Sequence, residues 1–329
     1  PADNVKEYTL ENGRQVFLLE DNSDALVHIT FTCHAGFSSQ TQNTCGFFKL
    51  FARLIEHTTP SVSFSEVLCN SDSTQYTLDV SPQQLDNTLD SLSQNMFSPI
   101  FTDEQITSEL NILKNEISDN AETLSTYINA AIDSRVFSDA PWKNDSGIYP
   151  PLFKKTTSKT ARNILQDISL RWYIPQNSAI FIYGNINSER LLLSLKQTFG
   201  RFYSNYNTPV EKPCVPVNNQ RKYVFHHPEI SKELTQIVVQ YTMLSLEECN
   251  LLSAILNNDA SIFKQQILNI QELNIPGAEY INISPAHKRD NSRLIIQTLM
   301  QPPENKSLSV TSEEQVQDFL TQVNNISDS

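Results

Sequence analysis

The chain has 329 residues, of which 37 are acidic and 24 basic, and its formal net charge is −13. This length allows two domains of ordinary size that bury a core without disulfides or metals, and the acidic balance argues against the phosphate backbone of a nucleic acid as a partner. The five cysteines are scattered without a C-x-x-C pair, so we interpret them as buried free thiols rather than a disulfide framework or a zinc cluster.

The first residues are polar, and no apolar run approaches the roughly 18 residues that a membrane span needs. We therefore expect a soluble chain without a membrane span or a targeting segment. A leader removed before Pro1 is compatible with this beginning, so the sequence leaves the compartment open.

A β-hairpin opens the predicted fold. Two alternating apolar and polar runs flank Asn12-Gly13, a dipeptide that tight hairpin turns favour, and a third strand follows over residues 25–36. From Gly46 the apolar side chains recur at helical spacing, which predicts an amphipathic helix. The elements predicted next are a strand over 73–80, helices over 81–97, 102–137 and 157–173, a strand over 178–186 and a helix over 188–202.

Composition divides the chain after residue 204. Residues 205–220 are rich in Pro and Asn without any period, which predicts a linker between a first domain, 1–204, and a second domain, 221–329. In the second domain we expect strands over 221–228, 234–243, 277–284 and 293–301 and helices over 245–256 and 311–323. The repeated order predicts a duplicated α+β fold, with an antiparallel-rich sheet, helices packed on one face and an incomplete second copy.

Three segments carry a resemblance to a known family. A strand ends in Ala35-Gly36, and Gly46 follows ten residues later at the start of a helix. The strand and helix patterns of 73–97 come next, and Tyr-x-Pro-x-Asn at 173–177 precedes a further strand. In this order the segments resemble the insulinase/pitrilysin superfamily of inverted-motif zinc peptidases, which includes the mitochondrial processing peptidase. The resemblance covers the first domain end to end and the second more loosely.

The resemblance implies a clam-shell of two homologous metallopeptidase-type domains with a zinc site in the first. It implies peptide hydrolysis, in which zinc polarises a water molecule and a glutamate acts as general base. In the H-x-x-E-H motif, the two histidines lie on one helix face and reach one ion, and the glutamate abuts the bound water. A third ligand, also a glutamate, comes from a later helix.

Two registers place this motif on the chain, and neither preserves it. With the glycines aligned, which keeps the ten-residue spacing and which we favour, the two histidines fall on Lys49 and Arg53 and the general base on Ala52. With the local string A-R-L-I-E-H aligned instead, Arg53 takes the first histidine, while Glu56 and His57 are retained. Because the registers differ by about one helical turn, the candidate positions line one helix face in either case. In the favoured register the Glu-His pair is interpreted as an exposed helix end.

The later helix retains its glutamates. Thr102 and Gln105 form a capping box at its beginning. Glu109 and Glu116 lie seven residues apart on one face, and the resemblance implies that the later one binds zinc and the earlier one supports it. Both are vestigial metal candidates, as is His57.

Cations replace the expected ligands opposite these carboxylates. An arginine cannot lose its proton and therefore cannot be a zinc ligand. We hypothesise that Arg53, with Lys49, occupies the metal position and pairs with Glu116 and Glu109.

The second domain offers one weak candidate. The resemblance implies a substrate-binding tyrosine, which matches Tyr280, and an arginine, which falls on Leu268 or near Lys264. The His-His pair at 226–227 has no third ligand nearby in the sequence. His287 lies in a predicted hairpin tip, so we interpret it as solvated.

We predict a non-catalytic homologue of insulinase/pitrilysin-type zinc peptidases, which acts as an inactive half or partner subunit and shapes a peptide-binding cleft. Its expected partners are a peptide or unfolded polypeptide, and an active peptidase subunit or a missing C-terminal half; no cofactor is expected. Two alternatives stay open: an active zinc metalloendopeptidase that uses Glu56, His57 and Glu116, and a peptide-binding or scaffolding module.

Overall fold

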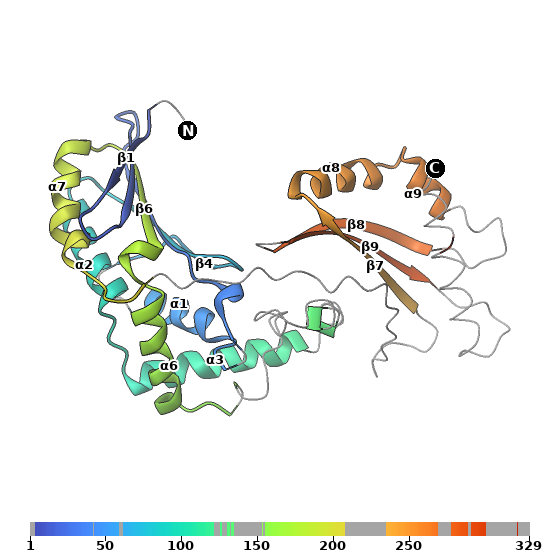
Figure 1. Cartoon of the computed structure of the whole chain (residues 1–329), viewed down its shortest axis with the longest axis horizontal. Helices are drawn as coiled ribbons and strands as arrows, with labels where there is room; N and C mark the ends of the chain where they lie inside the picture. Colours follow the sequence, from blue (N-terminus) through green and yellow to red (C-terminus); the bar gives the residue numbers. More distant parts are fainter. Residues whose placement is uncertain are drawn as a thin grey trace. The chain divides into compact units, whose positions relative to one another are not determined.

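The chain divides into two compact units, Pro1–Pro213 and Cys214–Ser329 (Figure 1). The computed structural model describes residues 4–41, 43–58, 62–121, 155–207, 235–268, 278–288 and 291–300, with isolated residues elsewhere. The predicted linker over 205–220 lies largely outside these ranges, so the predicted domain boundaries stay a prediction.

A six-stranded sheet lies at the centre of the first unit, with the strand order β1-β2-β6-β3-β5-β4. The strands are β1 (Lys6–Thr9), β2 (Gln15–Glu20), β3 (Val27–Cys33), β4 (Glu66–Cys69), β5 (Thr74–Val80) and β6 (Ser178–Gly184). Only β2 and β6 pair in parallel, and the other neighbouring pairs are antiparallel. The predicted antiparallel-rich α+β class is confirmed.

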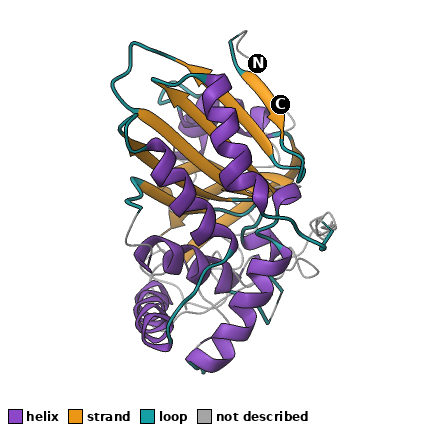
Figure 2. Ribbon diagram, turned by 90° about the vertical axis from the view of Figure 1, so that its left-hand side faces the viewer, coloured by secondary structure: helices purple, strands orange, loops and turns teal. Residues whose placement is uncertain are grey.

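One face of this sheet is buried and the other is open. Along β3 and β6 the side chains alternate between buried and more exposed positions, the period of two expected for a strand covered on one side. Two helices, α2 (Leu85–Phe97) and α7 (Ser188–Thr198), pack beside each other in front of the strands (Figure 2). Their apolar side chains join those of the strands in one core.

A second group of helices builds the candidate site. The helices α1 (Phe47–Thr58), α3 (Asp103–Ala121) and α6 (Ser158–Arg171) contact one another in pairs, as Figure 1 shows in the lower part of the first unit. α1 also packs against the edge strand β4. The apolar stripes of these helices belong to the same core as the sheet, so their relative positions are set by packing.

Hydrogen bonds to a segment distant in the sequence hold the turn of the predicted hairpin. Gly13 has a φ of 88°, in the left-handed region that glycine adopts without strain. The Asn12 side-chain amide donates to the backbone oxygens of Phe199 and Phe202 at 2.8 and 2.7 Å. Arg14 is fully buried and donates to the same Phe199 oxygen at 2.9 Å. The hairpin is therefore tied to the segment that follows α7.

The second unit has an antiparallel sheet with the strand order β7-β9-β8. Its described elements are β7 (Thr235–Leu244), α8 (Leu246–Asn257), α9 (Ile262–Leu268), β8 (Ala278–Lys288) and β9 (Asn291–Met300). Ser245 and Glu248 form a capping box at the start of α8, which packs on β8 and β9. Asn257 donates to the oxygen of Ile283 and accepts from its backbone N–H at 3.0 Å, which fixes α8 on β8.

The structure corrects three predictions. β4 and α9 were not predicted, because four and seven residues are too few to establish a period. His287 lies in β8, paired with Ser292, and not in a hairpin tip, because the two strands continue to within two residues of each other. Among the cysteines, Cys69 is only half-buried, on an edge strand.

The remaining cysteines of the described part, Cys33, Cys45 and Cys249, are buried thiols that form no disulfide, as predicted. Other predictions fall outside the described residues: those for Cys214 and His226–His227, the strand over 221–228, nearly all of the helix over 311–323 and most of 122–137.

Candidate functional site

Helix α1 presents an apolar face and a charged row. Its buried side chains are Phe47, Phe48, Leu50, Phe51, Ala52, Leu54 and Ile55. Gly46, with a φ of 86°, precedes the helix, and its N–H donates to Gln40 Oε1 at 3.0 Å. Lys49, Arg53 and His57 recur at four-residue spacing, so they lie in a row beside the buried stripe.

Helix α3 carries the carboxylates. The predicted capping box is confirmed: the Thr102 N–H donates to Gln105 Oε1 at 2.8 Å, and the Gln105 N–H donates to Thr102 Oγ1 at 3.2 Å. The buried stripe consists of Ile106, Leu110, Leu113 and Ile117. Glu109 and Glu116, two turns apart, lie beside this stripe and meet α1.

Five side chains of α1 and α3 form a continuous ion-pair network, which we call the α1–α3 charge cluster. Lys49 Nζ lies 3.2 Å from Glu116 Oε2. Arg53 donates through Nε to Glu109 Oε2 at 3.1 Å and through Nη1 to Glu116 Oε1. His57 Nδ1 lies 2.8 Å from Glu109 Oε1. Residues later in α1 contact residues earlier in α3, so the two helices run antiparallel.

The predicted contact of Arg53 with both glutamates is thus confirmed. The Glu109 side chain is 8% exposed and that of Arg53 18%, so this pair is the most buried of the cluster. Glu116 is 36% exposed and faces two cations. A carboxylate that is removed from water needs such partners, because an uncompensated buried charge costs several kcal/mol.

The cations keep Glu116 ionised. Partial burial alone would raise the pKa of Glu116, but the hydrogen bonds from Arg53 and Lys49 outweigh it and lower the pKa below the ordinary value of 4.5. For Arg53 the directions are reversed. Partial burial alone would lower the pKa of Arg53, but its hydrogen bonds to Glu109 and Glu116 raise the pKa instead. The stability contributed by Glu116 is therefore fully present above pH 4.5 and is lost as the pH falls through the lowered pKa.

His57 is more than an exposed helix end. Its Nδ1 contacts the buried Glu109, and its Nε2 lies 3.7 Å from Glu56 Oε2. His57 is exposed in the last turn of α1, as predicted, but the sequence did not indicate its contact with α3. Glu56, on the same turn, is 36% exposed.

The charge cluster does not fit a zinc ion. Lys49 and Arg53 hold the carboxylates, and a guanidinium has no lone pair to offer a metal. Within the described ranges, no three His, Cys, Asp or Glu side chains gather as a metal-binding group. Ala52, the base position of the favoured register, is 2% exposed and has no acidic group.

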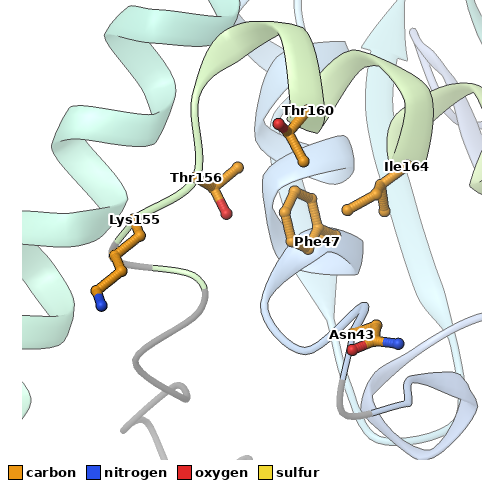
Figure 3. A pocket seen from close by; sticks show the side chains of 6 residues that line it. All are labelled: Asn43, Phe47, Lys155, Thr156, Thr160 and Ile164. Atoms are coloured by element: carbon orange, nitrogen blue, oxygen red, sulfur yellow. The ribbon is translucent and has the colours of Figure 1, made fainter.

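A cavity of about 170 Å³ lies beside the first turn of α1 (Figure 3). It is lined by Asn43, Phe47, Lys155, Thr156, Thr160 and Ile164. None of these is a carboxylate, histidine or cysteine, and none belongs to the charge cluster. The cavity therefore lacks the carboxylate, imidazole and thiolate ligands that zinc takes in proteins.

In the second unit, Tyr280 lies on β8 opposite Leu299. Leu268 is the last residue of α9. Lys264 Nζ contacts Asp259 Oδ1 at 2.6 Å and the Asn257 oxygen at 3.2 Å, so this cation is engaged within its own unit.

The Tyr-x-Pro-x-Asn segment has a structural explanation. Asn177 donates through Nδ2 to the backbone oxygens of His34 and Trp172, both at 2.9 Å. The backbone oxygen of Asn177 accepts the His34 N–H. The Tyr173 hydroxyl lies 2.8 Å from that of buried Tyr76. The segment thus joins the end of α6 to the end of β3, the strand that leads to α1.

Sequence reasoning missed a second titratable group, on the open sheet face. His28 lies between two carboxylates, Asp24 and Asp79, and its ring stacks on Tyr183. The alternation in residues 27–33 places His28 on the less buried face, but nothing in the sequence indicates its partners.

Two family models match the chain. "Insulinase (Peptidase family M16)" matches residues 18–146, and "Peptidase M16 inactive domain" matches residues 161–324. Together they span most of both units. The two models identify the chain as a metallopeptidase-like protein, and the chain belongs to the insulinase/pitrilysin superfamily. No protein of curated function matches it in sequence.

Solved structures share the fold. A protease from Helicobacter pylori matches with a TM-score of 0.73 at 15% identity, over 98% of this chain and 84% of that one. The first half of the periplasmic protease PqqL from Escherichia coli matches with a TM-score of 0.64 at 14% identity, over 91% and 69%. The ferredoxin protease FusC, in complex with Arabidopsis ferredoxin, matches with a TM-score of 0.70 at 18% identity, over 91% of this chain and 35% of FusC.

Every helix within the described ranges is too short or too polar to cross a membrane.

The Glu109→Gln substitution is expected to lower the free energy of unfolding by about 2 kcal/mol, because Arg53 and His57 lose a buried charged acceptor. Thermal unfolding should show this as a fall in Tm of roughly 4–8 °C. The matched control is Asp167→Asn, which breaks the exposed pair with Arg171 and should change stability by less than about 0.5 kcal/mol. Equal effects of the two substitutions would contradict a structural role for the charge cluster.

Proposed function

We propose that this chain is a non-catalytic member of the superfamily, in which Lys49 and Arg53 stand at the two histidine positions. The observation that carries the proposal is that both cations contact Glu116. Two positions four residues apart on one helix, facing one glutamate of a second helix, have the arrangement that two histidines and a third ligand need. In this register the base position is Ala52, which cannot accept a proton.

The contacts support the glycine register over the local one. In the local register Arg53 would stand at the first histidine position and His57 would be the retained second histidine, and both should then reach Glu116. His57 instead contacts Glu109, while Glu116 is contacted by Lys49. The retained Glu56-His57 pair therefore does not supply a general base and a ligand to a site at Glu116.

We infer that the chain acts as an inactive half or partner subunit that shapes a peptide-binding cleft. The chain spans 35% of the length of FusC and 69% of the PqqL half, which supports a further half or an active subunit as partner. The FusC structure holds a ferredoxin, which supports a peptide or polypeptide as the bound class.

Elemental mass spectrometry of the purified chain, after equilibration with zinc and desalting, tests the proposal. We expect zinc far below one ion per chain, and no change in Glu116→Gln. Near-stoichiometric zinc that Glu116→Gln abolishes would overturn the proposal and favour a zinc metalloendopeptidase.

Mixing the chain with a fluorescent, reduced and carboxymethylated polypeptide tests the peptide-binding role. The fluorescence anisotropy of the polypeptide should rise without cleavage, and no rise would leave the cleft role unsupported.

A further inference from the structure

The open face of the six-stranded sheet carries a histidine between two carboxylates. His28 Nδ1 lies 2.5 Å from Asp79 Oδ1, and His28 Nε2 lies 3.0 Å from Asp24 Oδ2. The ring stacks on Tyr183, with centroids 4.3 Å apart and planes inclined by 15°. Asp79 and Tyr183 are the direct cross-strand neighbours of His28 on β5 and β6. Three groups thus hold the ring in place.

Asp24, unlike Asp79 and Tyr183, does not lie on a strand. It lies in the connection between β2 and β3, and its Oδ1 accepts the backbone N–H of Leu26 at 3.0 Å. The same connection is attached to β6 by the Asp21 N–H, which donates to the Gly184 oxygen at 2.8 Å. The bond from His28 to Asp24 therefore links the connection to the end of β5 through a single imidazole.

This geometry requires a doubly protonated ring. A carboxylate only accepts hydrogen bonds, so both ring nitrogens must donate, and only the imidazolium can do so. A neutral ring donates to one carboxylate and turns a lone pair toward the other. Because the Asp79 contact is the shorter one, the remaining proton should stay on Nδ1, and Asp24 should lose its donor.

We propose that His28 is a pH-dependent latch: as an imidazolium it binds Asp24 and Asp79 together, and its deprotonation releases the connection between β2 and β3. The titratable groups around it are Asp24 and Asp79, the Tyr183 phenol, and Asp21 beside Asp24. The latch is independent of the charge cluster and of the catalytic status of the chain.

The direction of the pH dependence follows from the carboxylates. Partial burial alone would lower the pKa of His28, but the hydrogen bonds that the ring donates to Asp79 and Asp24 outweigh it and raise the pKa above the ordinary 6.5. The stability from the latch is therefore fully present below pH 6.5 and is lost as the pH rises through the raised pKa. The hydrogen bonds that Asp24 accepts from the backbone N–H of Leu26 and from the His28 ring lower the pKa of Asp24, which stays ionised throughout this range.

Titration of the full chain by NMR, with ¹³C-labelled histidine and ¹⁵N-labelled backbone, tests the latch. His28→Gln assigns the ring signal. We expect the ring to titrate above pH 6.5, and the Leu26 amide shift to follow the same midpoint. In Asp79→Asn and in Asp24→Asn the midpoint should fall by about one pH unit, because each removes one carboxylate.

His28→Gln is also the matched control for the connection, since glutamine does not titrate; in it the Leu26 amide should show no step in this pH range. The proposal would be overturned by a wild-type titration midpoint of the His28 ring at or below pH 6.5, or by a Leu26 amide shift that does not change as the ring titrates.

Discussion

Replacing Lys49 and Arg53 together by histidine is expected to give the chain a zinc site. The double substitution removes both cations that contact Glu116 and places two imidazoles four residues apart on the same helix face. Elemental mass spectrometry should find close to one zinc per chain, and adding Glu116→Gln should remove it. Zinc affinity should fall at acidic pH, because both imidazoles must be neutral to bind. Peptide hydrolysis should stay absent, since Ala52 remains at the base position.

Two controls make this result specific. Lys49→Gln with Arg53→Gln removes the same charges without adding ligands and should bind no zinc. Arg53→His alone completes H-x-x-E-H with Glu56 and His57, so it tests the local register. Stoichiometric zinc in this single variant would show that our register is wrong, because Lys49 still stands at the first histidine position of the glycine register. Glu109→Gln should then abolish binding, because Glu109 is the carboxylate that His57 contacts.

Gly36→Ala is expected to destabilise the first unit by at least about 3 kcal/mol, because a methyl group has no space there. A Cβ at this position would lie 2.1 Å from the backbone oxygen of Asn70 and 2.7 Å from that of Ser71. Both carbonyls are held in place, since they accept the N–H groups of Phe37 and Ser38 at 2.9 and 2.7 Å. The backbone must therefore shift at the segment that leads from β3 to α1.

Thermal unfolding measures the effect, and we expect Tm to fall by roughly 6–12 °C. Gly200→Ala is the matched control: its nearest contact would be 3.7 Å away, so its stability should change by less than about 1 kcal/mol. If Gly36→Ala were as well tolerated as this control, the close approach of the two loops would not constrain position 36.

Local patterns predicted most elements of the first unit. The helical period of residues 81–97 gave the buried face of α2 correctly, because a surface helix must turn its apolar stripe to the core. The alternation around Asn12-Gly13 located the first hairpin. Short elements were not predicted: β4 has four residues, and so short an edge strand shows no clear alternation.

The spacing of the charged residues indicated which side chains share a helix face, and the resemblance to the family implied that Arg53 faces both glutamates. It did not reveal the contact of His57 with Glu109, although the sequence placed His57 correctly at an exposed helix end. The choice between the two registers also depended on contacts, because positions one turn apart are equivalent in any helical pattern.

The sequence by itself thus determined the superfamily, most of the secondary structure of the first unit and the loss of H-x-x-E-H in both registers, because all three depend on residues close together in the chain. Only the tertiary structure decided which cation meets which carboxylate. Arg53 and Glu109 are 56 positions apart, and Lys49 and Glu116 are 67 apart. Their contact depends on how far α1 and α3 are offset along their antiparallel axes, and the packing of buried side chains between the helices sets that offset. The latch at His28 depends in the same way on the strand order, which brings Asp79 from β5 and Tyr183 from β6 to either side of one ring.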